Sequence, residues 1–541
     1  MYSAPVTTNP AELRSGIERY WGIDLPLALG VLEQLADGGS HRMAELVARS
    51  GVSREGVKQV LGLLGSAVSA EDRAVRLDPD FLAAPDQLRP VLTRPDRGTE
   101  ERLRTVLAAA RADLPAPRRD LDHVPATVDT VVHRALWLTE RFHLAGHRLL
   151  VLGDRDLTGL AVAALLPSVQ VTVVDVDDTV LGVLGEHARR AALDVRTWFA
   201  DLRLGLPEPV RDGADLVFTD PPYTADGIGL FARRGLEGLR RSGWARMAIC
   251  YGSGERQVEL SFQVQRALTR LGLMLEAVLP RFNTYQGAEA LGSASSLYLC
   301  RPTKHAWKQP GAEDGRLRIY SHGASSLESA DRLPAGLIGG QQGTGEELTV
   351  GEGWGRHPAV PVPDYLATLT GEAPGVRKRA MSSAVWLDLT AGFAGQLPRV
   401  LLCGPGRELT VAAPAGAQDT LAGHPHLDRL IRAGYRLEVR QFDGRVAVVT
   451  RRAEGGGSPV AAAAAELAKR TGAVAANALR EALITGCRAA GRQLSKNEAR
   501  ALLAEAGLPA AMQLARPAEL PLTELDAAAR ALLGILGYPD H

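Results

Sequence analysis

The chain has 541 residues with 62 basic and 62 acidic side chains, a length that predicts roughly two to four domains and a charge balance that disfavours nucleic-acid binding. Its four cysteines are far apart and form no C-x-x-C pair, so no metal site is predicted. No apolar run approaches the roughly 20 residues that span a bilayer, and residues 1–15 lack the basic start and apolar stretch of a signal peptide, so we expect a cytoplasmic protein without a membrane partner.

Residues 12–85 are predicted to form a winged-helix-like domain. Helices are expected over Leu25–Leu35 and Met43–Ser50, and residues 73–77 have the pattern of a strand. Such a domain can bind DNA, but residues 12–80 hold 8 Lys or Arg against 11 Asp or Glu, a net charge of −3. Electrostatics therefore favour a dimerisation or lid module over a DNA-binding one.

A stretch rich in Pro and Arg, residues 87–120, connects this domain to a region with a different pattern. From 125 to 305, short apolar runs alternate with helical segments, which predicts a Rossmann-like, doubly wound α/β sheet with crossover helices. The seven runs predicted as strands are 148–152, 170–174, 195–199, 216–219, 245–250, 274–279 and 296–300.

The sequence beyond residue 305 predicts two further units. Residues 303–340 are rich in Gly, Ser and charged residues and are expected to form a linker. Residues 341–452 are predicted to be an α+β extension, and residues 459–537, dense in Ala and Leu, a helical C-terminal domain. Strands of the α+β part are expected at 399–403, 408–412, 436–440 and 445–450. Neither unit carries a motif that indicates a particular chemistry.

The turn after the first strand of the sheet carries two acids. Gly153 is followed by Asp154, Arg155 and Asp156, ahead of a helix that begins near Leu157. In a doubly wound sheet a nucleotide-like ligand lies at this turn. Two acids would repel the pyrophosphate that a glycine-rich loop usually binds, whereas they suit a sulfonium or an ammonium group. We therefore expect the turn to bind a cationic ligand; in the alternative interpretation, Asp156 only caps the helix.

Two further strand ends carry acids. Asp175 lies 22 positions after the glycine turn, where a carboxylate binds ribose hydroxyls. Asp177 shares this prediction, but Asp177 and Asp178 also suit caps of the following helix. After the third strand, Asp201 is predicted to accept the exocyclic amine of adenine, with Leu202 beside it; an Asp after a strand is also often a turn residue.

The most specific motif follows the fourth strand and reads Asp220-Pro221-Pro222-Tyr223-Thr224. The strand brings Asp220 to the carboxyl edge of the sheet, and the two prolines stiffen the turn that holds Tyr223 beside it. A carboxylate, a rigid backbone and an aromatic ring together form a receptor for an amine nucleophile. Asp220 and Tyr223 are thus the predicted catalytic residues, with Pro221, Pro222 and Thr224 in the substrate site.

The motif at Asp220–Tyr223 is similar to that of amino-group methyltransferases, including those that act on bases in nucleic acid. Over a longer stretch, about residues 12–305, the chain resembles the branched-chain polyamine synthases, also called N4-bis(aminopropyl)spermidine synthases. The acidic turn after Gly153 and the strand end Asp175-Val-Asp177 belong to this resemblance. It continues through 199–203, 219–224, 231–235, 282–285, 287–288, 291–293 and 295–298.

This resemblance implies a winged-helix-like domain before a Rossmann-like fold of the class I S-adenosylmethionine transferases, in a homodimer. It also implies transfer of an aminopropyl group from decarboxylated S-adenosylmethionine to an amine or polyamine, with release of methylthioadenosine. Asp220 would position and deprotonate the amine. Asp154 and Asp156 would anchor the donor's ammonium group or another polyamine nitrogen, and Tyr223 would line the acceptor channel.

Arg155 departs from the family, which has an acid at the middle of this turn. A like charge ~6 Å from a cationic ligand costs roughly 3 kcal/mol at an effective dielectric constant of ~20. Arg155 either points away or pairs with a carboxylate, such as that of intact S-adenosylmethionine or an amino-acid acceptor. One alternative function is therefore a methyl- or aminocarboxypropyltransferase that uses intact S-adenosylmethionine. A DNA-binding metabolite sensor is the second, which the neutral charge and the Asp220–Tyr223 motif disfavour.

Overall fold

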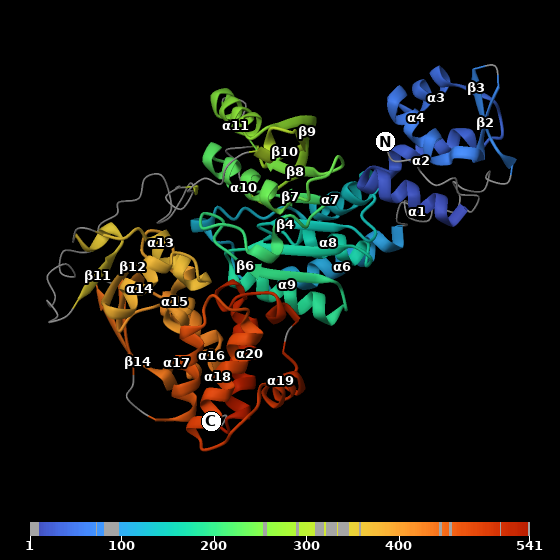
Figure 1. Cartoon of the computed structure of the whole chain (residues 1–541). Coiled ribbons are helices and arrows are strands. Elements are labelled where there is room, and N and C mark those ends of the chain that lie inside the picture. Colours follow the sequence, from blue (N-terminus) through green and yellow to red (C-terminus); the bar gives the residue numbers. More distant parts are fainter. Residues whose placement is uncertain are drawn as a thin grey trace.

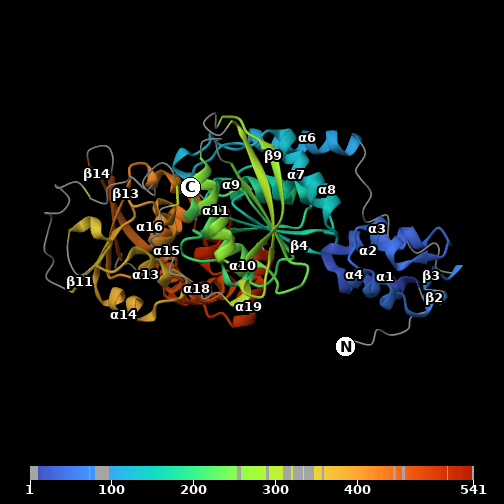
Figure 2. The same ribbon diagram turned by 90° about the horizontal axis from the view of Figure 1, so that it is seen from above.

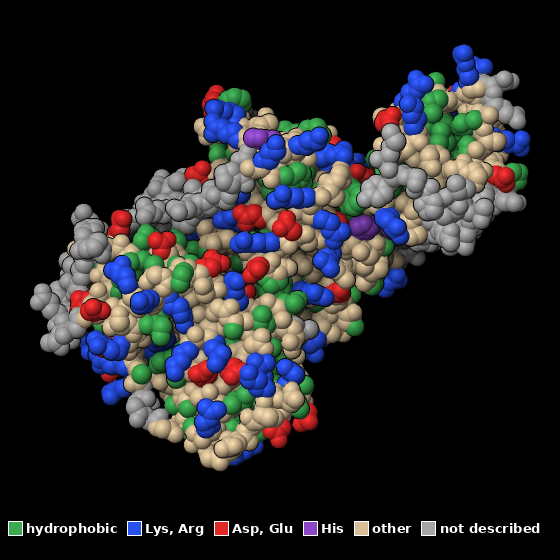
Figure 3. Space-filling view, viewed as in Figure 1, with side chains coloured by type: hydrophobic (Ala, Val, Ile, Leu, Met, Phe, Trp, Pro, Cys, Tyr) green, Lys and Arg blue, Asp and Glu red, His purple; other side chains and the backbone are tan. Residues whose placement is uncertain are grey.

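The computed structural model describes residues 10–71, 73–79, 97–252, 257–287, 292–308, 319–320, 333, 346–355, 359–442, 446–453, 457–508 and 510–538. A small N-terminal domain, a central α/β domain and a C-terminal extension (the described residues from 346 to 538) follow one another along the molecule (Figures 1 and 2). Among these residues, none of the helices has the length and apolar character needed to cross a bilayer. On the face shown in Figure 3, basic and acidic side chains are intermingled over the central domain and the extension.

The N-terminal domain consists of helices packed beside a small antiparallel sheet, in the order β1-β3-β2. Its elements are α1 (Pro10–Trp21), α2 (Leu25–Leu35), α3 (Met43–Ser50), α4 (Arg54–Leu64), β1 (His41–Arg42), β2 (Val68–Glu71) and β3 (Ala74–Leu77). The two helices and the strand predicted here are confirmed. The domain meets the central domain through a buried ion pair between Asp24 and Arg246 (3.1 Å). Arg246 also forms an ion pair with Glu276, at 2.5 Å.

The central domain contains a seven-stranded sheet in the order β6-β5-β4-β7-β8-β10-β9. Strand β10 pairs antiparallel with both β8 and β9, and the other neighbouring strands pair in parallel. Its strands are β4 (Arg148–Leu152), β5 (Gln170–Asp175), β6 (Val195–Phe199), β7 (Leu216–Thr219), β8 (Arg246–Tyr251), β9 (Leu273–Thr284) and β10 (Ala294–Pro302). All seven predicted strands are therefore present. Strand β9 is longer than predicted because it forms a long antiparallel pair with β10.

Both faces of this sheet are covered by helices, which explains its continuous apolar runs. Leu149 and Val151 of β4 face one core, and Leu150 and Leu152 face the other. The first core packs against α6 (Arg97–Ala112), α7 (Val128–Arg141), α8 (Thr158–Leu165) and α9 (Asp178–Arg190), and the second against α10 (Ala225–Gly238) and α11 (Val258–Arg270). The strand order reverses between β4 and β7, and at such a point a doubly wound sheet binds its ligand beside the carboxyl ends of its strands.

Helix α6 is an unexpected element, since it lies in the stretch interpreted as a connection at 87–120. Its Leu103, Leu107 and Ala110 recur at helical spacing and are buried against the central domain. The many charged residues between them concealed that apolar stripe.

The C-terminal extension has a five-stranded sheet in the order β11-β12-β13-β15-β14, parallel from β11 to β13 and antiparallel beyond. The strands are β11 (Glu347–Val350), β12 (Ala384–Asp388), β13 (Glu408–Pro414), β14 (Tyr435–Phe442) and β15 (Val446–Ala453). The strand predicted at 399–403 is wrong, because this segment belongs to helix α15 (Leu397–Cys403). Every residue of α15 is buried, so its apolar run has no polar face that would reveal the helical period.

Helices complete the extension and join it to the central domain. They are α13 (Val362–Leu366), α14 (Pro374–Ser382), α16 (Pro425–Gly434), α17 (Pro459–Lys469), α18 (Ala475–Ala489), α19 (Lys496–Glu505) and α20 (Leu522–Ile535). Apolar residues from these helices and from the five-stranded sheet form one core, which is continuous with the core around α10 and α11. The extension and the central domain therefore share a packed interior.

Candidate active site

A cavity of about 1000 Å³ lies at the carboxyl ends of the central strands, at the point where the strand order reverses. Most of the predicted site residues line it: Gly153, Asp154, Asp156, Asp175, Leu202, Asp220, Pro221, Pro222 and Tyr223. Further walls come from residues between 117 and 125, from Tyr285 and from Ile319 and Tyr320. Asp177, Asp201 and Thr224 are not among the lining residues.

Asp154 is held in place by backbone amides. Its carboxylate accepts hydrogen bonds from the amides of Thr158 (2.7 Å) and Gly159 (2.8 Å), so Asp154 caps α8. The cap considered for Asp156 therefore belongs to Asp154. Burial raises the pKa of Asp154 well above its usual value, and the neighbouring Asp156 and Asp175 add to the effect. A cationic ligand group beside these acids would relieve their repulsion.

Asp175 and Asp177 have different surroundings. Asp175, at the end of β5, accepts hydrogen bonds from the amides of Asp154 and Asp177, both at 2.9 Å, and lines the cavity. Burial and the nearby Asp177 raise the pKa of Asp175 to about 6. The carboxylate of Asp177 instead accepts from the amide of Thr179 at 3.0 Å and caps α9. Asp175 is thus the better placed of the two for a ribose.

Asp201, predicted to contact adenine, has a protein partner and is not among the residues that line the cavity. Its carboxylate forms a buried ion pair with Arg203, with 2.6 Å between Oδ2 and Nη2. The sequence prediction did not take account of Arg203, which lies two residues later and competes for the carboxylate. Leu202, between them, does line the cavity.

Thr224, predicted to lie in the substrate site, is not among the lining residues and uses its hydroxyl within the protein. Its hydroxyl accepts from the amide of Gly227 at 2.9 Å and so caps α10. The same hydroxyl donates to the carbonyl of Ile319 at 3.0 Å. Thr224 therefore fixes a wall residue, because the N-cap geometry turns its side chain towards the backbone.

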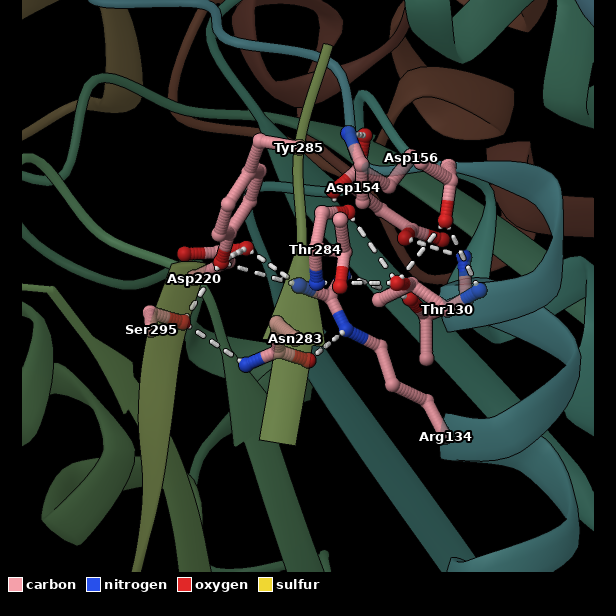
Figure 4. A network of polar contacts seen from close by, with 12 residues as sticks. Thr130, Arg134, Asp154, Asp156, Asp220, Asn283, Thr284, Tyr285 and Ser295 are labelled. Carbon is pink, nitrogen blue, oxygen red and sulfur yellow. Dashed lines mark hydrogen bonds and ion pairs between the residues drawn. The ribbon is translucent and has the colours of Figure 1, made fainter. Parts of the chain in front are cut away.

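Arg134 is the main site residue that the sequence analysis missed (Figure 4). It comes from α7, is fully buried and lines the cavity. Its guanidinium donates to Asn283 Oδ1 (2.7 Å), Asp156 Oδ2 (3.0 Å) and Asp220 Oδ2 (2.5 Å). The sequence did carry a signal for this residue. Arg134 is a charged residue within the apolar pattern of the helix, next to the buried Ala135.

Asp220 is surrounded by three donors. Besides Arg134, the hydroxyl of Tyr285 donates to Oδ2 (2.8 Å) and that of Tyr223 to Oδ1 (2.9 Å). Burial and the nearby Asp220 raise the pKa values of both tyrosines well above normal, so both remain protonated donors at neutral pH. Since a carboxylate has about four acceptor positions, one position remains for a ligand.

The remaining contacts of this network hold Tyr285 in place. Its hydroxyl lies 2.8 Å from Ser295 Oγ, which accepts in turn from the side-chain amide of Asn283 at 2.8 Å. Asn283 and Ser295 are buried on the paired strands β9 and β10. The polar groups around Asp220 thus form a connected network inside the domain, and such a network fixes the orientation of its members.

Arg155 occupies the rim of the cavity. Its Nη2 donates to the carbonyl of Pro115 at 2.6 Å, so the first of the two alternatives for this residue agrees with the structure: the guanidinium is directed to the backbone beside the site. Burial lowers the pKa of Arg155. The cavity lining as a whole contains five Asp and three Arg, and it therefore remains suited to a cationic ligand.

The central part of the chain is similar to a family of known proteins. Residues 101–311 match the model of the branched-chain polyamine synthase A C-terminal domain. The N(4)-bis(aminopropyl)spermidine synthase of Thermus thermophilus is 31% identical over 176 residues, which are 32% of this chain and 50% of that protein. Residues 101–311 are thus similar to the branched-chain polyamine synthase family. The resemblance predicted from the motifs is thereby confirmed for this segment.

Other relatives show the same extent of similarity. The N(4)-bis(aminopropyl)spermidine synthase of Methanocaldococcus jannaschii is 29% identical over 178 residues, 32% of this chain and 49% of that protein. The uncharacterized protein MJ0675 of the same organism is 33% identical over 175 residues, 32% of this chain and 44% of its own length. The chain thus spans about half the length of these curated relatives.

Among solved structures, the chain is similar to the branched-chain polyamine synthase from Thermus thermophilus, in complex with N4-aminopropylspermidine and 5′-methylthioadenosine. The TM-score is 0.35 at 22% identity, with 56% of this chain and 97% of that chain covered. A putative RNA methyltransferase from Pyrococcus horikoshii has a TM-score of 0.29 at 15% identity, with 37% of this chain and 98% of that chain covered.

Proposed function

We propose that this protein transfers an aminopropyl group from decarboxylated S-adenosylmethionine to an amine of a polyamine, with release of methylthioadenosine. The observation that carries the proposal is the setting of Asp220, which has three protein donors and one acceptor position left beside an acidic cavity. An amine N–H suits that position, because its hydrogen bond to the carboxylate leaves the nitrogen lone pair directed elsewhere.

The donor would occupy the end of the cavity formed by the loops after β4 and β5. Asp175 would accept hydrogen bonds from the ribose hydroxyls, which a buried carboxylate can do in its ionised form. Asp154 lies next to it, and a sulfonium or ammonium group bound beside it would favour its ionised form. This assignment follows the order of the strands in the sheet, since β5 and β4 are neighbours.

Asp220 would orient the acceptor amine, because the contact with Arg134 holds its carboxylate in place. Displacement uses the lone pair of the nitrogen, so the reacting amine would be neutral. A nitrogen–carbon bond forms as the carbon–sulfur bond breaks, the electron pair leaves with the thioether, and the amine proton passes to Asp220 or water. Alignment would supply most of the acceleration, because the thioether is a good leaving group.

The test begins with calorimetric titration of the full-length chain with decarboxylated and with intact S-adenosylmethionine. We expect the decarboxylated donor to bind more tightly, and incubation with spermidine to yield methylthioadenosine together with an aminopropylated polyamine. Tighter binding of the intact donor, with transfer of a methyl or aminocarboxypropyl group, would overturn the proposal. In that case Arg155 becomes the candidate partner of the donor carboxylate.

For the N-terminal domain we propose a winged-helix-like module that supports a homodimer of a cytoplasmic enzyme. Its excess of acids over basic residues supports this role over DNA binding. A DNA shift assay at increasing salt tests the alternative, since binding to phosphates weakens steeply with salt. Sedimentation of the full chain and of its N-terminally truncated form tests the dimer.

A further inference from the structure

The C-terminal extension packs against two loops that line the cavity beside the donor site proposed above. These loops follow β5 and β6 and contribute Asp175, Val176, Ala200 and Leu202 to the lining. In Figure 1 the helices of the extension lie beside α9 and β6, on the side of the sheet where these loops begin. The family match ends at residue 311, before the extension begins.

Arg399 makes the strongest contact with the first of these loops. It comes from α15, is fully buried, and binds both oxygens of Asp178, at 2.8 and 2.9 Å. Its remaining donors reach the carbonyls of Ala518 (3.0 Å) and Leu520 (2.6 Å). Asp178 also accepts from the amide of Leu522, at 2.9 Å. The loop that carries Asp175 is thus attached to the extension through the acid three residues later.

The same arginine also contacts β6. Its guanidinium lies over the ring of Phe199, with 3.3 Å between Cζ and the ring centroid. Phe199 is buried and directly precedes Ala200, a lining residue. Arg399 thus forms a bidentate ion pair after β5 and a cation–π contact at the end of β6. Together these contacts fix the ends of the two strands relative to each other.

The second loop is attached at another point. Arg203, which pairs with Asp201, donates to the carbonyl of Gly392 at 2.7 Å. Its guanidinium lies 4.1 Å from the ring centroid of Phe393. Both residues belong to the loop after β12 of the extension, and Leu202 of the cavity lining lies between the two members of the ion pair. The side chains behind the nucleotide pocket are therefore held from outside the family segment.

We propose that the extension supports the adenosine pocket from behind, and that Arg399 is a positioning residue for bound nucleotide. Without Arg399, Asp178 would lose its charged partner, and of its contacts with the extension described above only the hydrogen bond from the amide of Leu522 would remain. The identity of the donor rests on the function proposed above, but the inference concerns only the adenosine part that any such donor shares. It gives the extension a role in ligand binding.

The experiment compares nucleotide affinity in full-length variants by calorimetry with methylthioadenosine. We expect Arg399→Met to weaken binding about tenfold, the range of a typical coupling between sites. The matched control is Arg377→Met, because Arg377 also makes several hydrogen bonds, all within the extension, to Thr368, Thr471, Ala468 and Lys469. This control should keep the wild-type affinity, and the KM of the polyamine should stay unchanged in both variants.

A double variant separates positioning from a general loss of stability. Arg399→Met combined with Asp178→Asn removes both charges, so no buried charge is left without a partner and the fold is less disturbed. We expect nucleotide binding to stay weak in this variant, because the contact with Arg399 is still missing. Recovery of wild-type affinity in the double variant, or equal losses in Arg377→Met and Arg399→Met, would overturn the inference.

Titration with S-adenosylhomocysteine distinguishes the inference from the proposed function. If wild-type protein binds S-adenosylhomocysteine and transfers no aminopropyl group, the proposed donor is wrong, and the same variants compared with this ligand still support or overturn the role of Arg399. If the wild type binds neither nucleoside, both proposals fail.

Discussion

The buried Arg134 forms an ion pair with the partly buried Asp220 in the cavity lining, with 2.5 Å between Nη2 and Oδ2. The arginine comes from α7 and the acid from the turn after β7, 86 positions later in the chain. Because Arg134 also binds Asp156, it links the acidic turn after β4 to the Asp220–Tyr223 turn after β7. The two predicted parts of the site are therefore held at a fixed separation by one residue.

Replacing Arg134 should destabilise the whole domain. In Arg134→Met, both Asp156 and Asp220 lose their charged partner in a buried place. Breaking a buried pair in this way lowers the free energy of unfolding by about 3–5 kcal/mol. Urea denaturation measures the change. Arg104→Met is the control, since the ion pair of Arg104 with Asp129 is exposed and should contribute about 1 kcal/mol or less. Equal losses in both variants would contradict a structural role of the network.

Asp220→Asn tests the predicted catalytic acid. The amide keeps the size of the side chain but cannot accept hydrogen bonds at both of its polar atoms, so the amine loses its partner. We expect kcat to fall by about 10²- to 10⁴-fold, while the affinity for methylthioadenosine remains unchanged. Steady-state kinetics and calorimetry give the two quantities. Asp226→Asn, an exposed neighbour on α10, should behave as wild type; a similar loss there would argue against a specific role of Asp220.

The pH dependence of nucleotide binding should follow Asp175. Burial and Asp177 raise the pKa of Asp175 to about 6, and the ionised form is the one that accepts hydrogen bonds from ribose. Affinity for methylthioadenosine should therefore be constant above neutral pH and decrease as the pH falls through 6, by about tenfold one unit below the pKa. Calorimetry from pH 5 to 8 measures this profile.

Asp175→Asn is the companion variant for that profile. It should bind methylthioadenosine weakly at every pH, because the neutral amide does not titrate. Burial also raises the pKa of the adjacent Asp154. If the pH dependence persists in Asp175→Asn, Asp154 is the group that controls binding, and the assignment of Asp175 to the ribose is wrong.

Arg155→Asp restores the acid that the family carries at this turn. The change moves the charge at the cavity rim by two units, and a polyamine carries several positive charges. We expect the KM of spermidine to fall by at least about tenfold, which is the effect of two charge units ~6 Å from a cationic group in water. Arg155→Ala should give an intermediate KM. An unchanged KM in both variants would show that Arg155, bonded to the Pro115 carbonyl, lies too far from the acceptor to matter.

Much of the fold was determined by local sequence pattern. The seven strands of the central sheet were predictable because each is a short apolar run bounded by polar turns, and the parallel strands are buried on both faces. The same parallel arrangement brings Asp154, Asp175 and Asp220 to the carboxyl edge of the sheet. Each of these acids lies at or just after the end of a parallel strand. The acidic cavity was therefore foreseeable without a structure.

Other features depended on contacts that no local pattern contains. Arg134 meets Asn283 across 149 positions, and only the long pairing of β9 with β10 brings Asn283 and Ser295 to it. Asp201 forms an ion pair with Arg203, whose guanidinium also donates to the carbonyl of Gly392 in the extension. Helix α15 resembled a strand because it is buried on all sides, which erases the helical period. The sequence alone thus determined which strand ends carry acids. Which of those acids remain free for a ligand was decided by the tertiary structure, because buried charges must be paired and their partners come from distant segments.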